Sequence, residues 1–393
     1  MSKQKIYFVL HDVYFWFLRL IFFWILTKKS KNKKLLIIRT DHIGDFIIFS
    51  PAIKYIKSIY PDYEIYFLGN RILAEIINWF PQIDQFIPLD IKKFQFNPFY
   101  YLQIFYRLRK EFFDIVLCPV YSRSFTVDEL VRISNAKKKI GFSGDNNNID
   151  LEKKIKDDKF YTNLIKSSSQ VLSEIERNKI FVESLGLKLN NDLFPKIEIQ
   201  PIWREKAIKL LRENDWKGLK YAVVNPGAGS PCRIWPVEKF GKITNFLLEK
   251  GFVVVFTGGP NEEYLFDDIY QYVDKKVNNN VLTLINKTSF EELSAILSDA
   301  IFYFGAECGV LHLALAVGCP TIGILGGGHF GRFFPYGDLN KNRIVYDKNM
   351  KCQNDNWQCA RPHPDKPAPC IENIQIADAI KEINFLLDSF KQK

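Results

Sequence analysis

The chain of 393 residues lacks the signatures of several protein classes. It has no nucleic-acid-binding motif, so its formal net charge of +10 does not by itself indicate a nucleic-acid-binding protein. It also lacks a disorder-prone composition, because 47% of its residues are hydrophobic and 25% are charged. Its seven cysteines form no obvious disulfide framework, which predicts reduced thiols in the cytoplasm. What is left is a folded protein of two domains of ordinary size, whose positive charge suits an anionic membrane surface or a phosphorylated substrate.

The first 34 residues differ from the rest, being apolar and aromatic and ending in a cluster of lysines. No small-residue cleavage site follows them, which argues against a secretory signal. Lys5, Asp12, Arg19 and Lys28 recur at about two helical turns, and on a helix they would form one narrow polar stripe. We therefore predict an amphipathic helix lying on the membrane surface. A transmembrane span and a helix packed on the protein itself are the alternatives.

From Leu35 onward, short β-rich apolar runs alternate with longer segments of helical period. Examples are "KLLIIR" and "DIVLCPV" in the first half and "YAVVNPG" and "AIFYFGAE" in the second. This alternation predicts an α/β fold with parallel sheets covered on both faces. The polar region from about Asn146 to Glu205 separates two such sets. We predict doubly wound, Rossmann-like domains over residues 35–200 and 201–345, followed by a Cys/Pro-rich loop and a C-terminal helix over 346–393.

Three loops of the second half suit an anion, and each follows a predicted strand, where open α/β sheets bind ligands. Glycines let backbone N–H groups approach a phosphate, and a helix N-terminus favours negative charge. None of these loops contains a P-loop or a GxGxxG fingerprint, which disfavours NTP hydrolysis and NAD chemistry. Together they predict a nucleotide-diphosphate site. The candidates are Gly227 and Arg233 in the first loop, Gly258, Gly259 and Glu262 in the second, and Cys308 and Gly309 at the helix start in the third.

The first predicted strand ends in "TDHIGDF", which places Asp41, His42 and Asp45 directly before an apolar segment. A carboxylate here could remove a proton from a reacting hydroxyl, or it could simply favour a helix N-terminus. Asp41 fits a loop or capping acid, and His42 fits a residue at the solvent edge.

The motifs occur in the order found in glycosyltransferase family 9, the ADP-heptose:lipopolysaccharide heptosyltransferases, and from Leu35 to its end the chain resembles that family. The resemblance implies a GT-B fold, in which two Rossmann-like domains face a cleft and take the acceptor and the nucleotide sugar, respectively. It also implies an inverting reaction without a catalytic metal. The stretches that carry the resemblance are "IIRTDHIGDFIIFSPAIKYIKSIYPDYEIYFL", "FDIVLCPVYSRS", "NPGAG" with "RIWP", "TGGPNEE" and "GAECGVLHLALAVGCPTIGILG".

The resemblance also implies roles for single residues. Asp45 matches the proposed general base, and Gly44 before it lets the acceptor approach the backbone. Arg233 matches the residue that neutralises the leaving diphosphate. The family usually has Asp followed by Ser or Thr where this chain has Glu307 and Cys308, so the donor need not be ADP-heptose. The other implied donor contacts are Glu262 for the ribose, Thr288 for the base, Gly309 for the diphosphate and His312, which equally fits a packed helix residue.

Two further groups have open interpretations. Arg123 and Lys138 could bind phosphates of a lipid-linked or core-oligosaccharide acceptor, although a charged run is usually a solvated face. In "CQNDNWQCARPHPDKPAPC" three thiols and an imidazole could hold a structural zinc or iron. Asp355 stands where a richer cysteine cluster in some family members has its second cysteine, so a plain thiol-bearing loop is the alternative. The candidate ligands are Cys352, Cys359, His363 and Cys370.

The sequence therefore predicts an inverting glycosyltransferase that needs no cofactor and lies peripherally on the cytoplasmic face of the inner membrane. Its donor would be a nucleotide-diphosphate sugar, with ADP favoured, and its acceptor a lipopolysaccharide-core or other lipid-linked glycan. Nucleic acid is not an expected partner. A sugar-nucleotide epimerase or hydrolase, and a non-catalytic membrane-bound scaffold for nucleotide sugars or glycans, are the alternatives.

Overall fold

The computed structural model describes residues 33–166, 171–276, 278–360 and 362–391. The helix expected before residue 34 therefore lies outside the described residues. The chain divides into two compact units. The first comprises Met1–His42, Ile53–Ser169 and Ile180–Lys188, and the second comprises Ile43–Ala52, Gln170–Lys179 and Leu189–Lys393. Within the described ranges, no helix is both long and apolar enough to cross a bilayer.

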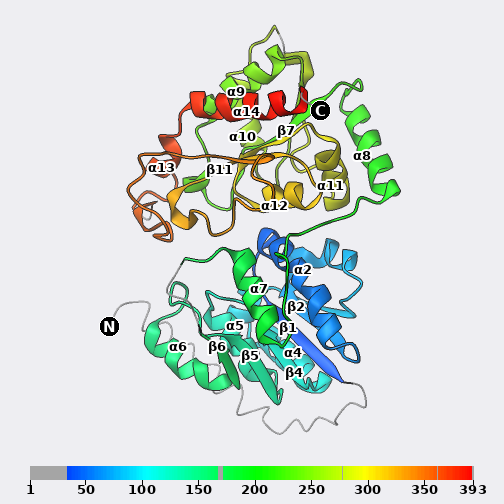
Figure 1. The fold of residues 1–393 in the computed structure, drawn as a ribbon, viewed down its shortest axis with the longest axis vertical. Helices are drawn as coiled ribbons and strands as arrows, with labels where there is room; N and C mark the ends of the chain where they lie inside the picture. The colour runs from blue at the N-terminus through cyan, green and yellow to red at the C-terminus, as the bar shows by residue number, and fades with distance from the viewer. Residues whose placement is uncertain (1–32, 167–170, 277, 361, 392–393) are drawn as a thin grey trace. The chain divides into compact units, whose positions relative to one another are not determined.

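The first unit contains a six-stranded sheet in which every strand pairs in parallel (Figure 1). The strand order β3-β2-β1-β4-β5-β6 reverses direction between β1 and β4. In such a sheet, ligands bind at the carboxyl ends of the two strands on either side of the reversal. The strands are β1 (Lys34–Arg39), β2 (Glu64–Asn70), β3 (Gln85–Leu89), β4 (Ile115–Cys118), β5 (Lys138–Phe142) and β6 (Asn163–Ile165).

Local sequence signals begin the helices of this half of the chain. Asn97 caps α4 by accepting from the Tyr100 N–H, and Pro98 follows at the first helical position. Ser124 caps α5 in the same way. The division between the two units falls inside α2 and α7. The helices are α2 (Ile43–Ile59), α3 (Ile91–Phe96), α4 (Pro98–Glu111), α5 (Phe125–Ile133), α6 (Leu151–Asp157) and α7 (Glu174–Ser184).

The second unit repeats the plan with a parallel sheet of order β12-β11-β10-β7-β8-β9, which reverses between β10 and β7. Its strands are β7 (Tyr221–Asn225), β8 (Val253–Phe256), β9 (Val281–Thr283), β10 (Tyr303–Ala306), β11 (Thr321–Ile324) and β12 (Asn342–Val345). Its helices are α8 (Pro201–Glu213), α9 (Val237–Glu249), α10 (Glu263–Tyr270), α11 (Phe290–Asp299), α12 (Gly309–Ala316), α13 (Pro369–Glu372) and α14 (Ile376–Lys391).

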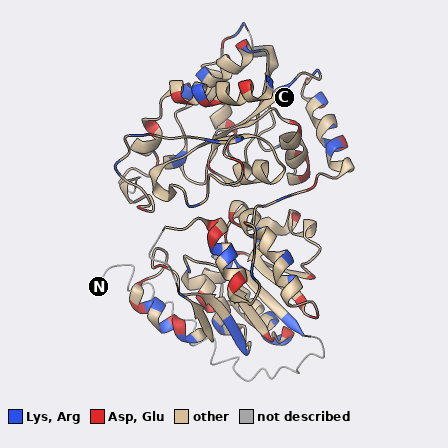
Figure 2. Ribbon diagram, in the orientation of Figure 1, with Lys and Arg blue, Asp and Glu red and all other residues tan. Residues whose placement is uncertain are grey.

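The predicted α/β class with two parallel sheets is confirmed. β7, β8, β10 and β11 are buried along their whole length, which explains their continuous apolar sequences. The C-terminal helix α14 packs its apolar face on this same unit, with Ile383 and Leu386 fully buried. On outer helices such as α6, α8 and α14, acidic and basic side chains are interspersed (Figure 2).

Candidate functional site

The direction reversal of the second sheet brings two of the predicted anion-suited loops together. One loop follows β7 and leads to the 3₁₀ turn Pro231–Arg233, and the other follows β10 and leads into α12. β7 and β10 are paired neighbours, so their carboxyl ends lie side by side. The Arg233 guanidinium donates to the Glu307 main-chain oxygen, and its Nη2 lies 3.8 Å from the Glu307 carboxylate. A fixed cation therefore stands where such sheets bind ligands.

Glu307 is the most perturbed acid of this site. Its side chain is only 5% exposed, and burial raises its pKa to about 7, against the opposing charges of Arg233 and Arg332. Oε1 has no hydrogen-bond partner among the described residues. A buried polar oxygen without a partner is costly, so this oxygen is suited to a ligand hydroxyl.

The start of α12 lies next to this pair. Cys308 is the N-cap, and its thiol accepts from Asn225 Nδ2 at 3.5 Å and lies 3.7 Å from the Tyr303 hydroxyl. Burial raises the pKa of the Cys308 thiol, so it is neutral at physiological pH. Sequence reasoning gave no role to Tyr303 or to Asn225, although Asn225 is the first residue of the quoted stretch "NPGAG".

His312, one turn along α12, is a packed residue. Its ring is buried and stacks on Tyr336 with centroids 5.9 Å apart, and its Nδ1 lies 3.3 Å from the Tyr336 hydroxyl. Burial lowers the pKa of His312 to about 3, so the ring is neutral. A neutral ring adds no charge to the site.

Glu262, the residue expected to contact the ribose, has its carboxylate packed against three glycines. Its Oε2 accepts from the Gly259 N–H at 2.6 Å, and burial raises its pKa. A Cβ on Gly227 would lie 2.2 Å from Glu262 Oε1, and one on Gly258 would lie 2.8 Å from Oε2. Gly227 and Gly258 thus make room for this carboxylate. Thr288 lies half-buried between β9 and α11.

The structure adds a tryptophan that sequence reasoning did not select. The Trp357 ring centroid lies 5.6 Å from the Arg233 guanidinium carbon. The same ring covers the loop after β11, where a Cβ on Gly326 or Gly328 would lie 2.3 Å from ring atoms. Gly326–Gly331 has the G-x-G-x-x-G spacing, but here its glycines accommodate an indole. Trp357 therefore stacks beside the one arginine predicted at the diphosphate.

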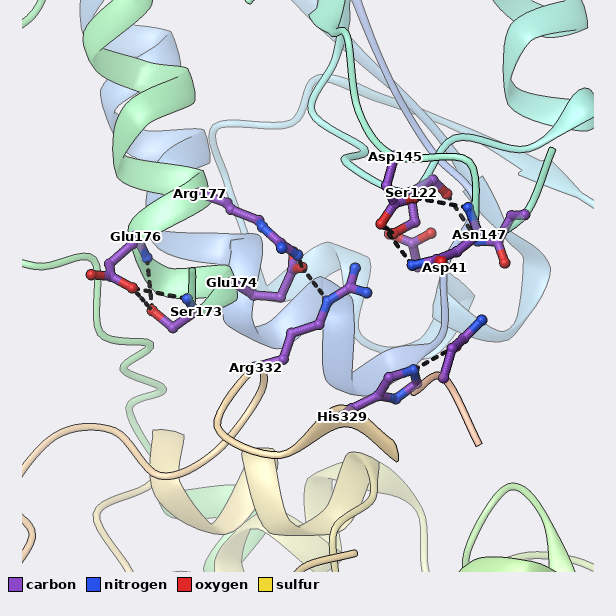
Figure 3. A network of polar contacts seen from close by, with 12 residues as sticks. Asp41, Ser122, Asp145, Asn147, Ser173, Glu174, Glu176, Arg177, His329 and Arg332 are labelled. Atoms are coloured by element: carbon purple, nitrogen blue, oxygen red, sulfur yellow. Dashed lines mark hydrogen bonds and ion pairs between the residues drawn. The ribbon is translucent and has the colours of Figure 1, made fainter. Parts of the chain in front are cut away.

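A second arginine is anchored nearby within the same unit. Arg332 Nε donates to Glu174 Oε1 at 2.9 Å, and Arg177 donates to the same oxygen at 2.6 Å (Figure 3). Arg332 also lowers the pKa of Glu307, so its charge reaches the site. Sequence reasoning missed Arg332 too, because it follows a glycine-rich loop that was not among the three loops chosen as suited to an anion.

The first turn of α2, which the division assigns to the second unit, contacts α12. A Cβ on Gly44 would lie 2.8 Å from His312 Cδ2 and 3.3 Å from Gly309 Cα. Asp45 follows in the first turn of α2 and is partly exposed. The two glycines let the backbones that carry Asp45 and the start of α12 approach closely.

Comparison with known proteins agrees with these observations. A model of glycosyltransferase family 9 (heptosyltransferase) matches residues 101–360. The chain belongs to this family. Lipopolysaccharide heptosyltransferase 3 of Escherichia coli (strain K12) is 27% identical to it over 292 residues, covering 72% of this chain and 79% of that protein.

Solved structures share the fold. The structure of E. coli ADP-heptose lps heptosyltransferase II covers 91% of this family 9 chain and 99% of its own, with a TM-score of 0.71 at 14% identity. The iron-containing dodecameric glycosyltransferase TibC from enterotoxigenic E. coli H10407 covers 94% and 83%, with a TM-score of 0.54 at 16% identity. The family match makes the protein a glycosyltransferase.

In the first unit of this family 9 protein, Arg123 lies in the core. Its side chain is fully buried, pairs with Asp158, lies 3.6 Å from Asp128 and stacks on the Tyr161 ring at 4.6 Å. The Tyr161 hydroxyl donates to Asp128 at 2.7 Å. No surface of Arg123 is left for a phosphate, and we leave it out of the proposed acceptor site.

Lys138 is also misplaced for that role. It is the first residue of β5, which runs parallel to β4, and so lies at the amino edge of the sheet. The carboxyl edge, where a ligand is expected, is formed instead by the loops after β1, β4 and β5.

Those loops carry Asp41 and His42, which the sequence analysis considered, and further polar residues that it did not select. Ser122 donates to Asp145 at 2.9 Å, and the Asn147 side chain donates to the same carboxylate at 2.8 Å (Figure 3). Asp41 pairs with Arg39 Nε at 2.8 Å, and His42 is exposed. A cluster of hydroxyl, amide and carboxylate groups suits a sugar better than a phosphate.

The C-terminal cysteine segment fits a metal with a changed ligand set. Cys352 and Cys359 Sγ lie 3.9 Å apart, close to the about 3.7 Å that two thiolates adopt on one tetrahedral zinc. Ligand atoms of Cys352, Asp355 and Cys359 lie within 4.8 Å of one another. His363 and Cys370 do not belong to this group, and Cys370 accepts from the Gly327 N–H at 3.2 Å.

Proposed function

We propose that the protein transfers a sugar, heptose or another hexose-type sugar, from a nucleotide diphosphate to a hydroxyl of a lipopolysaccharide or other cell-surface glycan precursor. ADP is the favoured nucleotide, in keeping with the solved ADP-heptose enzyme of the same fold. The observation that supports the proposal is the close approach of Gly44, the residue before Asp45, to Gly309 and His312 of α12.

The proposed step is a single displacement that inverts the anomeric carbon. The acceptor oxygen forms a bond to the anomeric carbon as the bond to the diphosphate oxygen breaks, and Asp45 takes the hydroxyl proton. Arg233 stabilises the charge that develops on the leaving diphosphate, and the N-terminal amides of α12 add their dipole. Since these groups supply a base and a positive charge, the proposed reaction needs no catalytic metal.

Substituting Asp45 tests this assignment. D45N should lower turnover about 10²- to 10⁴-fold, because proton removal by a positioned base contributes on that order. ADP binding, measured by calorimetry, should be unchanged. D62N is the matched control, since the Asp62 side chain is 78% exposed beyond the C-terminal end of α2, and it should keep its turnover. Equal turnover of D45N and the wild type would rule out Asp45 as the base.

The same assay separates the alternatives. Nucleotide release from a panel of ADP-, GDP- and UDP-sugars is measured with and without glycolipid extract. Release that needs the extract supports transfer. Release without the extract supports hydrolysis or rearrangement of the donor, and binding without release supports a scaffold.

We further propose that the protein lies peripherally on the cytoplasmic face of the inner membrane and that its first 34 residues form the amphipathic contact. The apolar, aromatic composition of that segment and its terminal lysines support this.

We also propose that Cys352, Asp355 and Cys359 hold a structural zinc or iron ion. The thiol spacing fits such an ion, and TibC, which shares the fold, is described as iron-containing. A bound ion would stabilise the conformation of the loop that carries Trp357. Asp355 already accepts from the N–H groups of Trp357 and Cys359, at 3.0 and 3.2 Å.

A further inference from the structure

The first unit exposes large aromatic side chains at the end of α3 and along one face of α4, a surface that we call the stripe. Phe99 at the start of α4 is 82% exposed, Phe96 at the end of α3 is 63% exposed, and Tyr106 is 49% exposed. Phe99 and Tyr106 are seven residues apart on α4, so they share a helix face. Lys110 continues that face another turn along. A single exposed aromatic residue is ordinary, but several on one stripe mark an interaction surface.

The stripe lies in a segment whose charged side chains are all positive. Residues 91–110 contain five cationic and no acidic side chains. The acids that flank the segment are paired elsewhere, Asp90 with Arg71 at 3.2 Å and Glu111 with Lys34 at 2.6 Å. The cations of the segment are Lys92, Lys93, Arg107, Arg109 and Lys110.

The stripe runs between two functional places of this unit. The end of α4 is tied through Glu111 to Lys34, the first residue of β1, so the described chain begins beside this end of the helix. The start of α4 follows the carboxyl end of β3 through α3, so Phe96 and Phe99 lie toward the edge that carries Asp41, Ser122 and Asp145. A helix of 14 residues covers about 21 Å between these edges.

We propose that Phe96, Phe99, Tyr106 and the surrounding lysines form a second membrane contact, which takes anionic phospholipid headgroups between its cations and inserts its rings at the acyl boundary. Aromatic rings beside lysines are the composition of interfacial contacts. A second copy of the chain would bring cations against cations, so it fits the stripe poorly. This second membrane contact does not depend on the proposed sugar transfer, so it would also exist in a protein without catalytic activity.

The test uses the full chain and sedimentation with vesicles of phosphatidylcholine, alone or with about one third phosphatidylglycerol, a typical anionic share. The double variant F96S/F99S should bind anionic vesicles at least about tenfold more weakly, because burial of one ring already contributes more than a factor of ten. K92E/K93E should abolish most of the gain from phosphatidylglycerol. L339S removes a side chain that is 55% exposed in the second unit, and its binding should equal that of the wild type.

Other occupants of the stripe give different results. If residues 1–32 pack on it, F96S/F99S will unfold at a lower temperature while vesicle binding stays the same, which overturns the proposal. If an acidic protein binds there, vesicle binding will again be unchanged, with the same consequence. ADP binding serves as the check that each variant is folded, and it should match the wild type throughout.

Discussion

Replacing Glu307 by Gln should change how the stability of the second unit depends on pH. The folded state raises the pKa of this carboxyl to about 7 from its ordinary value of 4.5 because the side chain is buried. Its proton is therefore held more tightly in the folded state than in the unfolded state. The cost of folding with a charged Glu307 is absent below the unfolded pKa, grows as the pH rises from about 4.5 to 7, and is constant above that.

The magnitude follows from the size of the shift. One pKa unit corresponds to about 1.4 kcal/mol, so the wild type should lose about 2 to 3 kcal/mol of unfolding free energy, relative to E307Q, between pH 5 and pH 8. The amide of the variant does not titrate. Loss of the contact with Arg233 shifts the variant by a constant amount and leaves the slope unaffected.

Urea unfolding followed by tryptophan fluorescence measures this difference. Four of the seven tryptophans, Trp203, Trp216, Trp235 and Trp357, lie in the second unit, so the fluorescence includes a signal from its unfolding. Other buried acids titrate equally in both proteins, and subtraction removes them. A difference between wild type and E307Q that stays constant from pH 5 to pH 8 would refute the account of Glu307 as a buried, proton-holding acid.

Two further predictions concern the loop beside Arg233. W357L should weaken ADP binding, measured by calorimetry, roughly 2- to 30-fold, which corresponds to the loss of a cation–π contact of about 0.5 to 2 kcal/mol. W357F keeps an aromatic ring, so its ADP affinity should stay close to that of the wild type. Equal ADP affinity of W357L and the wild type would contradict the stacking role. C352S and C359S should each lose the zinc or iron that mass spectrometry detects in the purified wild-type protein, while the control C319S should retain it. A wild-type protein that holds no metal above background would contradict the proposed ion.

The sequence was most informative where strands are central. Runs such as "YAVVN" and "VVVF" are continuously apolar because both faces of β7 and β8 are covered, and the structure has strands there. β3, β6 and β12 were missed. They lie at sheet edges, and half-exposed edge strands such as "QFIPL" and "NRIV" contain polar residues or proline that hide the pattern.

The candidate site was predicted in part, for a similar reason. Residues in the loops that follow strands, such as Arg233 and Glu307, can be found because parallel strands end at a common edge. Trp357 and Arg332 approach that edge from loops far along the chain, and no local pattern reports such a contact. The acceptor role predicted for Arg123 was wrong for a different reason. A basic residue after a strand resembles a phosphate ligand in the sequence, but in the structure Arg123 already pairs with Asp128 and Asp158.

The position of Trp357 also gives the protein an optical property. An indole 5.6 Å from the Arg233 guanidinium is sensitive to any charge that this cation meets, whereas Trp235 is fully buried in the core. A diphosphate that draws Arg233 toward itself would change the quenching and emission wavelength of Trp357 alone. Occupancy by ADP could then be followed by unlabelled fluorescence, and the difference between wild type and W357F would isolate that signal.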